Sequence, residues 1–219
     1  QHNLCTYDHA APGLYATVAF SLTGGNILKW FRDEFGYEEI EKAKNLDCDP
    51  YELLLERAGS KPSDLLVLPY FTPTGTPYFD SNVSGAILGL KLSTKKGEII
   101  RALLEGVALE IKLNIDILEK SGCRINELRV IGGGAKSDIW NQLKADVTGK
   151  TITVLDITEA GCMGAAILAK TAKTGENLSK ITNKWIRPIS TKTPNQELLN
   201  IYNQKFKKYQ KLNSQLKHL

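Results

Sequence analysis

The sequence predicts an α/β or α+β domain in which helices flank one mixed sheet. Expected strands come first, and strands and helices then alternate along the second half of the chain, an order typical of those fold classes. The 219 residues are 42% hydrophobic and 24% charged, which is ordinary for a globular protein. A chain of that length has enough apolar surface for one compact core.

The first expected elements are a strand and two short helices. Residues 13–20 alternate in polarity and carry β-branched and aromatic side chains, which predicts a strand. A glycine turn at residues 23–26 then opens a helix over residues 27–35. After an Asp-Pro pair, a second helix is expected over residues 50–58.

The middle of the chain holds two strands, a long loop and the longest helix. Residues 65–71 form a continuous apolar run typical of a buried strand, and residues 86–92 indicate another. Between them, residues 72–85 are polar and too numerous for a simple connection, which predicts a functional loop. A helix capped by Ser93 or Thr94 follows, because apolar residues recur at spacings of three and four.

The second half alternates strand and helix around a glycine-rich turn. A strand over residues 127–131 runs into Gly-Gly-Gly-Ala at residues 132–135. Ser137 is a good N-cap for a helix over residues 138–148, and residues 151–155 indicate the next strand. The chain therefore places a glycine turn between a strand and a helix.

Two further helices complete the prediction. Residues 159–172 form a helix of small residues that can pack close to a neighbour or a ligand. The sequence Thr-Pro-Asn-Gln at residues 193–196 predicts a capping box with Pro at the first helical position, opening a terminal helix. The apolar face of that helix can pack on its own domain or on a second copy.

Charge and composition exclude several classes of protein. The net charge of +4 comes from residues 192–219, where six Lys and one acid give +5, while the rest of the chain sums to −1. The pattern favours a solvated helix face over a nucleic-acid interface. No run of 18 apolar residues and no signal peptide are present, so a membrane role is not expected.

The reactive side chains fit neither a metal site nor a disulfide scaffold. The four Cys lack any C-x-x-C spacing, which fits a reducing compartment. The three His, at positions 2, 9 and 218, lie near the termini, so no His is placed for a central catalytic triad or metal centre.

The glycine turn at residues 132–135 is the sharpest candidate for chemistry. Glycines let a flat ligand lie against the main chain, and the following helix N-terminus offers N–H groups to an anion or a polar ring edge. The sequence matches neither G-x-G-x-x-G nor a Walker A loop. A tight turn that simply requires several glycines remains the alternative.

A second glycine turn, Gly24-Gly25, also opens a helix. It can receive phosphate oxygens by the same logic, and the alternative is an N-cap with no ligand. Lys29, one turn further on, either adds a positive charge to that site or is an ordinary surface lysine.

Five sequence blocks, in order, resemble those of one known family. The blocks are TGGNILKWFRDEFG, LPYFTPTGTPYFDSNVSGAILGL, RALLEGVALEIKLNIDIL, IGGGAKSDIWNQLKADVTG and TEAGCMGAAILA. Together they resemble the FGGY carbohydrate kinases, which include xylulose, ribulose, gluconate, fuculose and glycerol kinases. The resemblance covers residues 13–172.

The resemblance implies a fold and a place in a larger enzyme. FGGY kinases have two domains of the actin-like ATPase, ribonuclease-H-like type, with sugar and ATP in the cleft between them. Residues 1–219 would be the C-terminal, nucleotide-binding domain, and the N-terminal sugar-binding domain is absent from the chain. The full enzyme would move the γ-phosphate of ATP to a hydroxyl of a pentulose or a related sugar or polyol, with Mg²⁺ bridging the phosphates.

The resemblance also assigns nucleotide-binding roles to individual residues. The turn at residues 132–135 and the helix start after it would line the adenine and ribose. The first glycine turn along the chain, at residues 24–25, would approach a phosphate, and a lysine stands where glycerol kinases have a phosphate-contacting Gln. The residues so assigned to ATP are Gly24, Gly25, Lys29, Gly133, Gly134, Ala135, Ser137 and Asp138.

Other parts of the family's site have no counterpart here. The general-base Asp belongs to the N-terminal part of the family, so this chain is expected to hold no catalytic residue and no metal ligand of its own. We therefore expect the fragment alone to be inactive. Thr74 and Gly75 replace the Glu-Arg pair usual in xylulose kinases, which weakens xylulose as the substrate.

Three hypotheses follow for the function. The first is the ATP-binding domain of a cytoplasmic sugar kinase, whose partners are the missing N-terminal domain and a sugar or polyol, with a homodimer as an open alternative. The second is a non-catalytic actin-like module that binds nucleotide. The third is a general interaction domain whose glycines only make turns.

Overall fold

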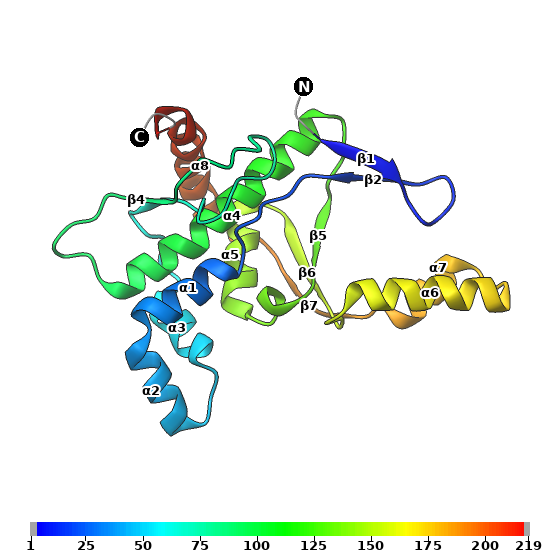
Figure 1. Cartoon of the computed structure of the whole chain (residues 1–219), viewed down its shortest axis with the longest axis horizontal. Helices are drawn as coiled ribbons and strands as arrows, with labels where there is room; N and C mark the ends of the chain where they lie inside the picture. The colour runs from blue at the N-terminus through cyan, green and yellow to red at the C-terminus, as the bar shows by residue number, and fades with distance from the viewer. Residues whose placement is uncertain (1–3, 217–219) are drawn as a thin grey trace.

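The computed structural model describes residues 4–216 as strands and helices around one large core (Figure 1). The strands are β1 (Cys5–Asp8), β2 (Tyr15–Val18), β3 (Leu66–Leu68), β4 (Ala86–Leu88), β5 (Glu127–Val130), β6 (Thr151–Leu155) and β7 (Pro188–Lys192). The helices are α1 (Asn26–Phe35), α2 (Tyr37–Leu46), α3 (Pro50–Ala58), α4 (Lys96–Lys120), α5 (Asp138–Thr148), α6 (Ala160–Thr174), α7 (Leu178–Trp185) and α8 (Gln196–Leu216), with a 3₁₀ turn at Gly133–Ala135.

The predicted mixed sheet is formed by β5, β6 and β7. β5 and β6 run parallel, with Val130 opposite Val154, and β7 runs antiparallel to β6, with Thr191 opposite Thr153. β1 pairs with β2, and β3 with β4, in two separate antiparallel sheets. The fold class is confirmed, and the four strands nearest the N-terminus form two antiparallel pairs separate from the mixed sheet.

α4 is the central helix of the core. Its residues from Ile100 to Ile117 are largely buried, and α1, α3, α5, α8 and β3 all contact it. Gly106 lets β3 approach closely, since a Cβ at that position would lie 3.0 Å from the Val67 Cβ. Burial of this long apolar face stabilises the fold, because it removes apolar surface from water.

Helix α8 closes the core and carries part of the predicted basic tail. Tyr202, Phe206 and Tyr209 are buried in the apolar cluster, so the helix packs its apolar face on its own domain. The prediction that the tail's charges form a solvated face holds only in part. Lys207 is exposed, whereas Lys205 donates to the carboxylate of the fully buried Glu105.

Glu105 is a buried carboxylate whose partners come from three segments. Arg101 Nε donates to it at 3.0 Å, the Tyr202 hydroxyl at 3.0 Å and the Ser63 backbone N–H at 3.1 Å. Burying a charge is costly unless it is paired and hydrogen-bonded, and Arg101, Tyr202 and Ser63 are themselves buried. The cluster fixes α8 against α4 and the segment before β3.

Two predicted helix caps are wrong. The terminal helix begins at Gln196, and Asn195 Oδ1 caps it by accepting from the Glu197 N–H at 2.9 Å, so Pro194 lies before the helix. α4 is capped at Lys95, whose backbone N–H donates to the Glu98 carboxylate at 2.8 Å. The acceptor side chain is Asn195 in α8 and Glu98 in α4, and each helix therefore begins later than predicted.

Several elements differ from the sequence prediction. The strand expected at residues 86–92 ends at Leu88, because Gly89 has a φ of +91° that breaks the extended conformation. β1, α2, α7 and β7 were not predicted. They are short or rich in exposed polar residues, so their hydrophobic periodicity is weak.

α6 and α7 form an arm that extends from the body of the domain (Figure 1). Only Ile167 of α6 and Ile181 of α7 are buried. Lys170 Nζ lies 5.1 Å from the centre of the Trp185 ring and joins the two helices. Most of the small residues predicted to form the packing face of α6 are therefore exposed or only partly buried.

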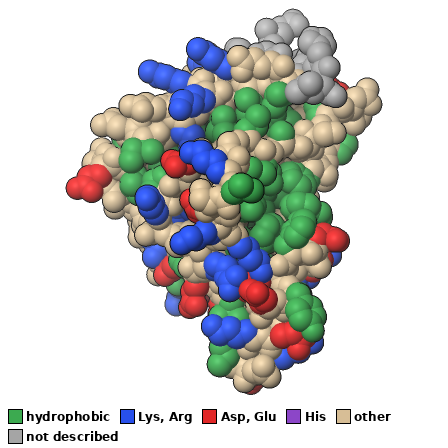
Figure 2. All heavy atoms as spheres, turned by 90° about the vertical axis from the view of Figure 1, so that its left-hand side faces the viewer, with side chains coloured by type: hydrophobic (Ala, Val, Ile, Leu, Met, Phe, Trp, Pro, Cys, Tyr) green, Lys and Arg blue, Asp and Glu red, His purple; other side chains and the backbone are tan. Residues whose placement is uncertain are grey.

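One face of the molecule carries both basic and acidic side chains. Lys and Arg side chains on it are interspersed with acidic ones and lie beside hydrophobic side chains (Figure 2). Within residues 4–216, no helix has the length and apolar character needed to cross a bilayer.

Candidate functional site

Trp140 brings the two glycine turns together. The indole is 5% exposed and lies on α5 between them. A Cβ at Gly134 would lie 3.3 Å from Trp140 Cζ3, and a Cβ at Gly25 would lie 3.9 Å from the same atom. Two turns that are more than a hundred residues apart in the sequence thus share one side chain, and they border one site.

The turn before α5 is shaped by glycine and closed by a cap. Gly132 has a φ of +80°, a conformation that favours glycine. The chain then makes a single 3₁₀ turn at Gly133–Ala135. Ser137 Oγ accepts from the Trp140 N–H at 3.1 Å, so the predicted N-cap is confirmed, and it sets the start of the helix that carries Trp140.

Two side chains of α5 hold the carbonyl groups of this turn. Asn141 Nδ2 donates to the Ala135 carbonyl at 2.6 Å, and Lys144 Nζ donates to the Gly134 carbonyl at 2.9 Å. Burial lowers the pKa of the Lys144 ammonium to about 8. Sequence reasoning missed both residues. The available signal was their place beside Trp140 on the buried face of α5, at spacings of one and four.

The first glycine turn ends at the N-terminus of α1. Asn26 Oδ1 accepts from the Gly24 N–H at 2.6 Å. Thr23 Oγ1 lies 2.7 Å from Thr72 Oγ1, which ties the turn to the loop after β3. The first turn of α1 has no acidic side chain, so the positive end of the helix dipole is not neutralised locally.

The main chain at two of the glycines faces open space. A Cβ at Gly133 or at Gly24 would meet no atom within 4 Å, whereas one at Gly134 would press on Trp140. Gly133 therefore presents main chain to open space. These are the features that a flat ring with an attached anion requires, and the residues present fit an adenine nucleotide.

The charged residues assigned to this site are engaged elsewhere. The Lys29 side chain is 64% exposed and lies 3.9 Å from Asp33 one turn along α1. Asp138 is 75% exposed at its side chain, and its carboxylate lies 3.1 Å from Lys192 Nζ. The glycines and Trp140 form the shared part of the site, while Lys29 and Asp138 lie at its exposed margins on their helices.

The loop at residues 72–85 is tightly folded. Thr74 Oγ1 accepts from the Asp80 N–H at 2.9 Å, and the Thr76 N–H donates to the Phe20 carbonyl at 2.9 Å. A Cβ at Gly75 would lie 2.1 Å from the Phe20 oxygen. The backbone path here thus accepts glycine at position 75 and excludes a larger side chain such as Arg.

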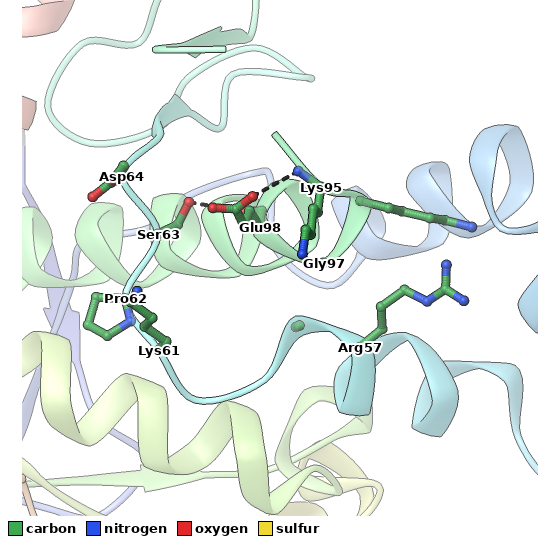
Figure 3. A pocket seen from close by; sticks show the side chains of 10 residues that line it. Arg57, Lys61, Pro62, Ser63, Asp64, Lys95, Gly97 and Glu98 are labelled. Atoms are coloured by element: carbon green, nitrogen blue, oxygen red, sulfur yellow. Dashed lines mark hydrogen bonds between the residues drawn. The ribbon is translucent and has the colours of Figure 1, made fainter. Parts of the chain in front are cut away.

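A separate cavity of about 390 Å³ lies beside the N-terminus of α4 (Figure 3). Its lining includes Arg57, Lys61 and Lys95, and Glu98 points toward Lys95 in the close view. Arg57 also lies 3.0 Å from Glu39, so acids and bases offset each other there. None of the residues lining this cavity belongs to either glycine turn.

The structure brings no metal centre together among the residues it describes, 4–216. His9 Nδ1 accepts from the Ala11 N–H at 2.9 Å, in a local turn. His2, His218 and Lys217 lie outside the described residues.

Comparison with known proteins decides the family. Residues 3–172 match the C-terminal domain of the FGGY family of carbohydrate kinases. The chain belongs to the FGGY carbohydrate kinase family. Its fold is the one seen in FGGY sugar kinases.

Relatives of this FGGY domain are kinases of different sugars and polyols. A gluconokinase from Bacillus licheniformis is 38% identical over 149 residues, which is 66% of this chain and 29% of the relative. A xylulose kinase from Staphylococcus epidermidis is 29% identical over 221 residues, which is 99% of this chain and 42% of the relative.

A solved structure of a sugar kinase has the same fold as this chain over part of its length. The xylulose kinase from Rhodospirillum rubrum superposes with a TM-score of 0.82 at 25% identity, covering 97% of this chain and 42% of that one. This FGGY chain therefore spans less than half the length of the relatives it matches.

Proposed function

We propose that this FGGY domain is the ATP-binding domain of a sugar kinase and forms one side of its active-site cleft. The observation that carries the proposal is the approach of the Trp140 ring to both glycine turns, where a Cβ at Gly25 or at Gly134 would lie within 4 Å of it, and this supports one shared site. The adenine would lie on the main chain at Gly133, Gly134 and Ala135, with Ser137 and Asp138 toward the ribose. Gly24, Gly25 and Lys29 would face the phosphates.

The residues of the chain would bind and orient the nucleotide. The N-terminus of α1 favours negative charge at the phosphates, and the open main chain at Gly133 admits a flat ring. ATP with Mg²⁺ supplies the γ-phosphate that the parent enzyme would transfer to a sugar or polyol hydroxyl. The general base would come from the N-terminal domain, and residues 1–219 would contribute position and electrostatics.

The proposal includes partners and a location. The partners would be the N-terminal domain of the same kinase and a sugar or polyol substrate. A homodimer would need a surface other than the buried apolar face of α8. Cys5 and Cys162 are exposed free thiols, which fits the reducing cytoplasm.

Gly133→Ala tests the nucleotide site directly. The added methyl meets no protein atom within 4 Å and Gly133 has no positive φ, so folding should be unchanged. A ring lying on that main chain would be displaced, and we expect affinity for ATP to fall roughly tenfold, measured by calorimetric titration.

Gly161→Ala is the matched control, because its methyl also enters open space. It should bind ATP like the wild type. Equal affinity in Gly133→Ala and Gly161→Ala would contradict the assigned adenine position, and no binding by the wild type would contradict the proposed function itself.

A further inference from the structure

Lys144 is an unusual residue to find inside this domain. The residue is 8% exposed, and its ammonium lies in the interior side of α5. Nζ donates to the Gly134 carbonyl at 2.9 Å and to Asn141 Oδ1 at 3.1 Å, and lies 4.7 Å from the centre of the Trp140 ring. Among the described residues, no carboxylate forms an ion pair with it.

A buried ammonium with only neutral partners is costly. A well-packed apolar side chain of similar size would avoid the desolvation penalty. The lysine contributes little that a core requires, and its partners are all parts of the candidate site. Its carbonyl partner belongs to the glycine turn, and its aromatic partner is the side chain that joins the two turns.

We propose that Lys144 is a positioning residue that orders the glycine turn for nucleotide binding. Its ammonium holds the Gly134 carbonyl toward α5, and Asn141 holds the Ala135 carbonyl in the same direction. With these carbonyls drawn inward, the opposite side of the turn is left as an open surface at Gly133. The same ammonium lies against the Trp140 ring, so one charge fixes both the turn and the indole beneath it.

This inference rests on the proposed function, and it adds a residue that touches no nucleotide. Lys144 acts through the main chain at Gly134 and through Trp140. Its effect on binding and its effect on stability therefore have opposite signs. Replacing a buried charge that has no carboxylate counter-ion by an apolar side chain of similar size should leave the fold at least as stable, while loosening the turn should weaken binding.

Lys144→Met is the test, because Met fills a similar volume without the charge. We expect the unfolding temperature to stay equal or rise. Hydrogen exchange in the peptide that covers residues 132–136 should quicken, and the affinity for ATP should fall roughly tenfold, the usual effect of losing one charge-assisted hydrogen bond.

Two further variants complete the design. Lys144→Gln keeps a donor without the charge and should lie between the wild type and Lys144→Met in both exchange and affinity. Lys207→Met removes the same charge from an exposed position on α8 and should match the wild type in every measurement.

The outcomes separate this inference from the proposed function. Unchanged exchange and unchanged ATP affinity in Lys144→Met would overturn the positioning role. A lowered unfolding temperature with faster exchange throughout the domain would show an ordinary structural lysine, which also overturns it. Absence of ATP binding in the wild type would overturn the proposed function and the nucleotide role of Lys144 together.

Discussion

Single residues in this domain set the chemistry of its interior. Glu110 is 1% exposed on α4, and burial raises the pKa of its carboxyl to about 7, against the lowering effect of hydrogen bonds from Tyr209 and Tyr70. In the unfolded chain the same carboxyl titrates near its ordinary value of about 4.3. The folded state therefore keeps a proton at Glu110 that the unfolded state has already released.

The stability of the domain should fall as the pH rises from about 4.5 to 7. In that window the folded state binds more protons than the unfolded state, so the free energy of unfolding decreases with pH and then levels off. The change attributable to Glu110 is on the order of 3 kcal/mol, from the size of the pKa shift. Urea unfolding at several pH values measures it.

Glu110→Gln removes the titrating group and should flatten this part of the profile. Glu34→Gln, at an exposed position on α1, should leave the slope as in the wild type. A slope that persists in Glu110→Gln would mean that other groups carry the pH dependence.

At the residue level the sequence predicted the glycine turns and the Ser137 cap, but not the side chains that hold the turn before α5. Runs of glycine between a strand and a helix are visible in the sequence, and so is the Ser137 cap. Asn141 and Lys144 escaped notice because a lone polar residue on a helix face usually indicates an exposed position. Only the packing of α5 shows that both are turned inward.

At the level of elements, close approach of backbone segments matters as much as hydrophobic pattern. The periodicity of α4 was plain in the sequence, and its buried face matches the prediction. The pairing of β3 against Gly106 was not predictable, because a glycine inside a helix carries no information about which strand approaches it.

Gly106→Ala should destabilise the domain despite the better helix propensity of alanine. The added methyl would lie 3.0 Å from both the Cβ and the carbonyl oxygen of Val67, so β3 must move. We expect an overpacking cost of about 1–3 kcal/mol against a gain of about 1 kcal/mol in helix propensity, so the net loss of stability should reach up to about 2 kcal/mol. Chemical denaturation measures the balance.

Gly164→Ala provides the matched case in a different helix. Its methyl meets no atom within 4 Å in α6, so only the propensity gain remains, and stability should rise by up to about 1 kcal/mol. Similar changes in both variants would contradict the role given to the α4–β3 contact.

At the scale of the whole molecule, the chain corresponds to one part of longer relatives that are sugar and polyol kinases. Its relatives are more than twice its length, and the matched family is a C-terminal domain. Family and fold class could be predicted because several ordered blocks are required to build this domain. The sequence could not predict that the strands divide into one mixed sheet and two antiparallel pairs, because strand pairing depends on contacts between segments distant in the sequence.

Residues 1–219 alone should show no phosphorylation of any sugar or polyol in the presence of ATP and Mg²⁺. Phosphoryl transfer requires the acceptor hydroxyl and the γ-phosphate to be held in line, and one wall of a cleft cannot hold both. A coupled ADP-release assay with a panel of pentuloses, gluconate and glycerol measures it, with a full-length relative such as the Bacillus licheniformis gluconokinase as positive control.

Turnover of any acceptor by the isolated chain would contradict the assignment of the general base to the N-terminal domain. It would also require a catalytic carboxylate among the residues described here.

The approach of Trp140 to two turns that are distant in the sequence has a consequence for folding as well as for binding. A nucleotide that touched both Gly25 and Gly134 would close a loop of more than a hundred residues, and closing so long a loop carries a large entropic cost that folding has already met. The ligand would then bind only the globally folded chain, and its stabilisation would grow with the logarithm of its concentration. Saturating ATP would thus suppress opening of the domain as a whole, including segments that never touch it.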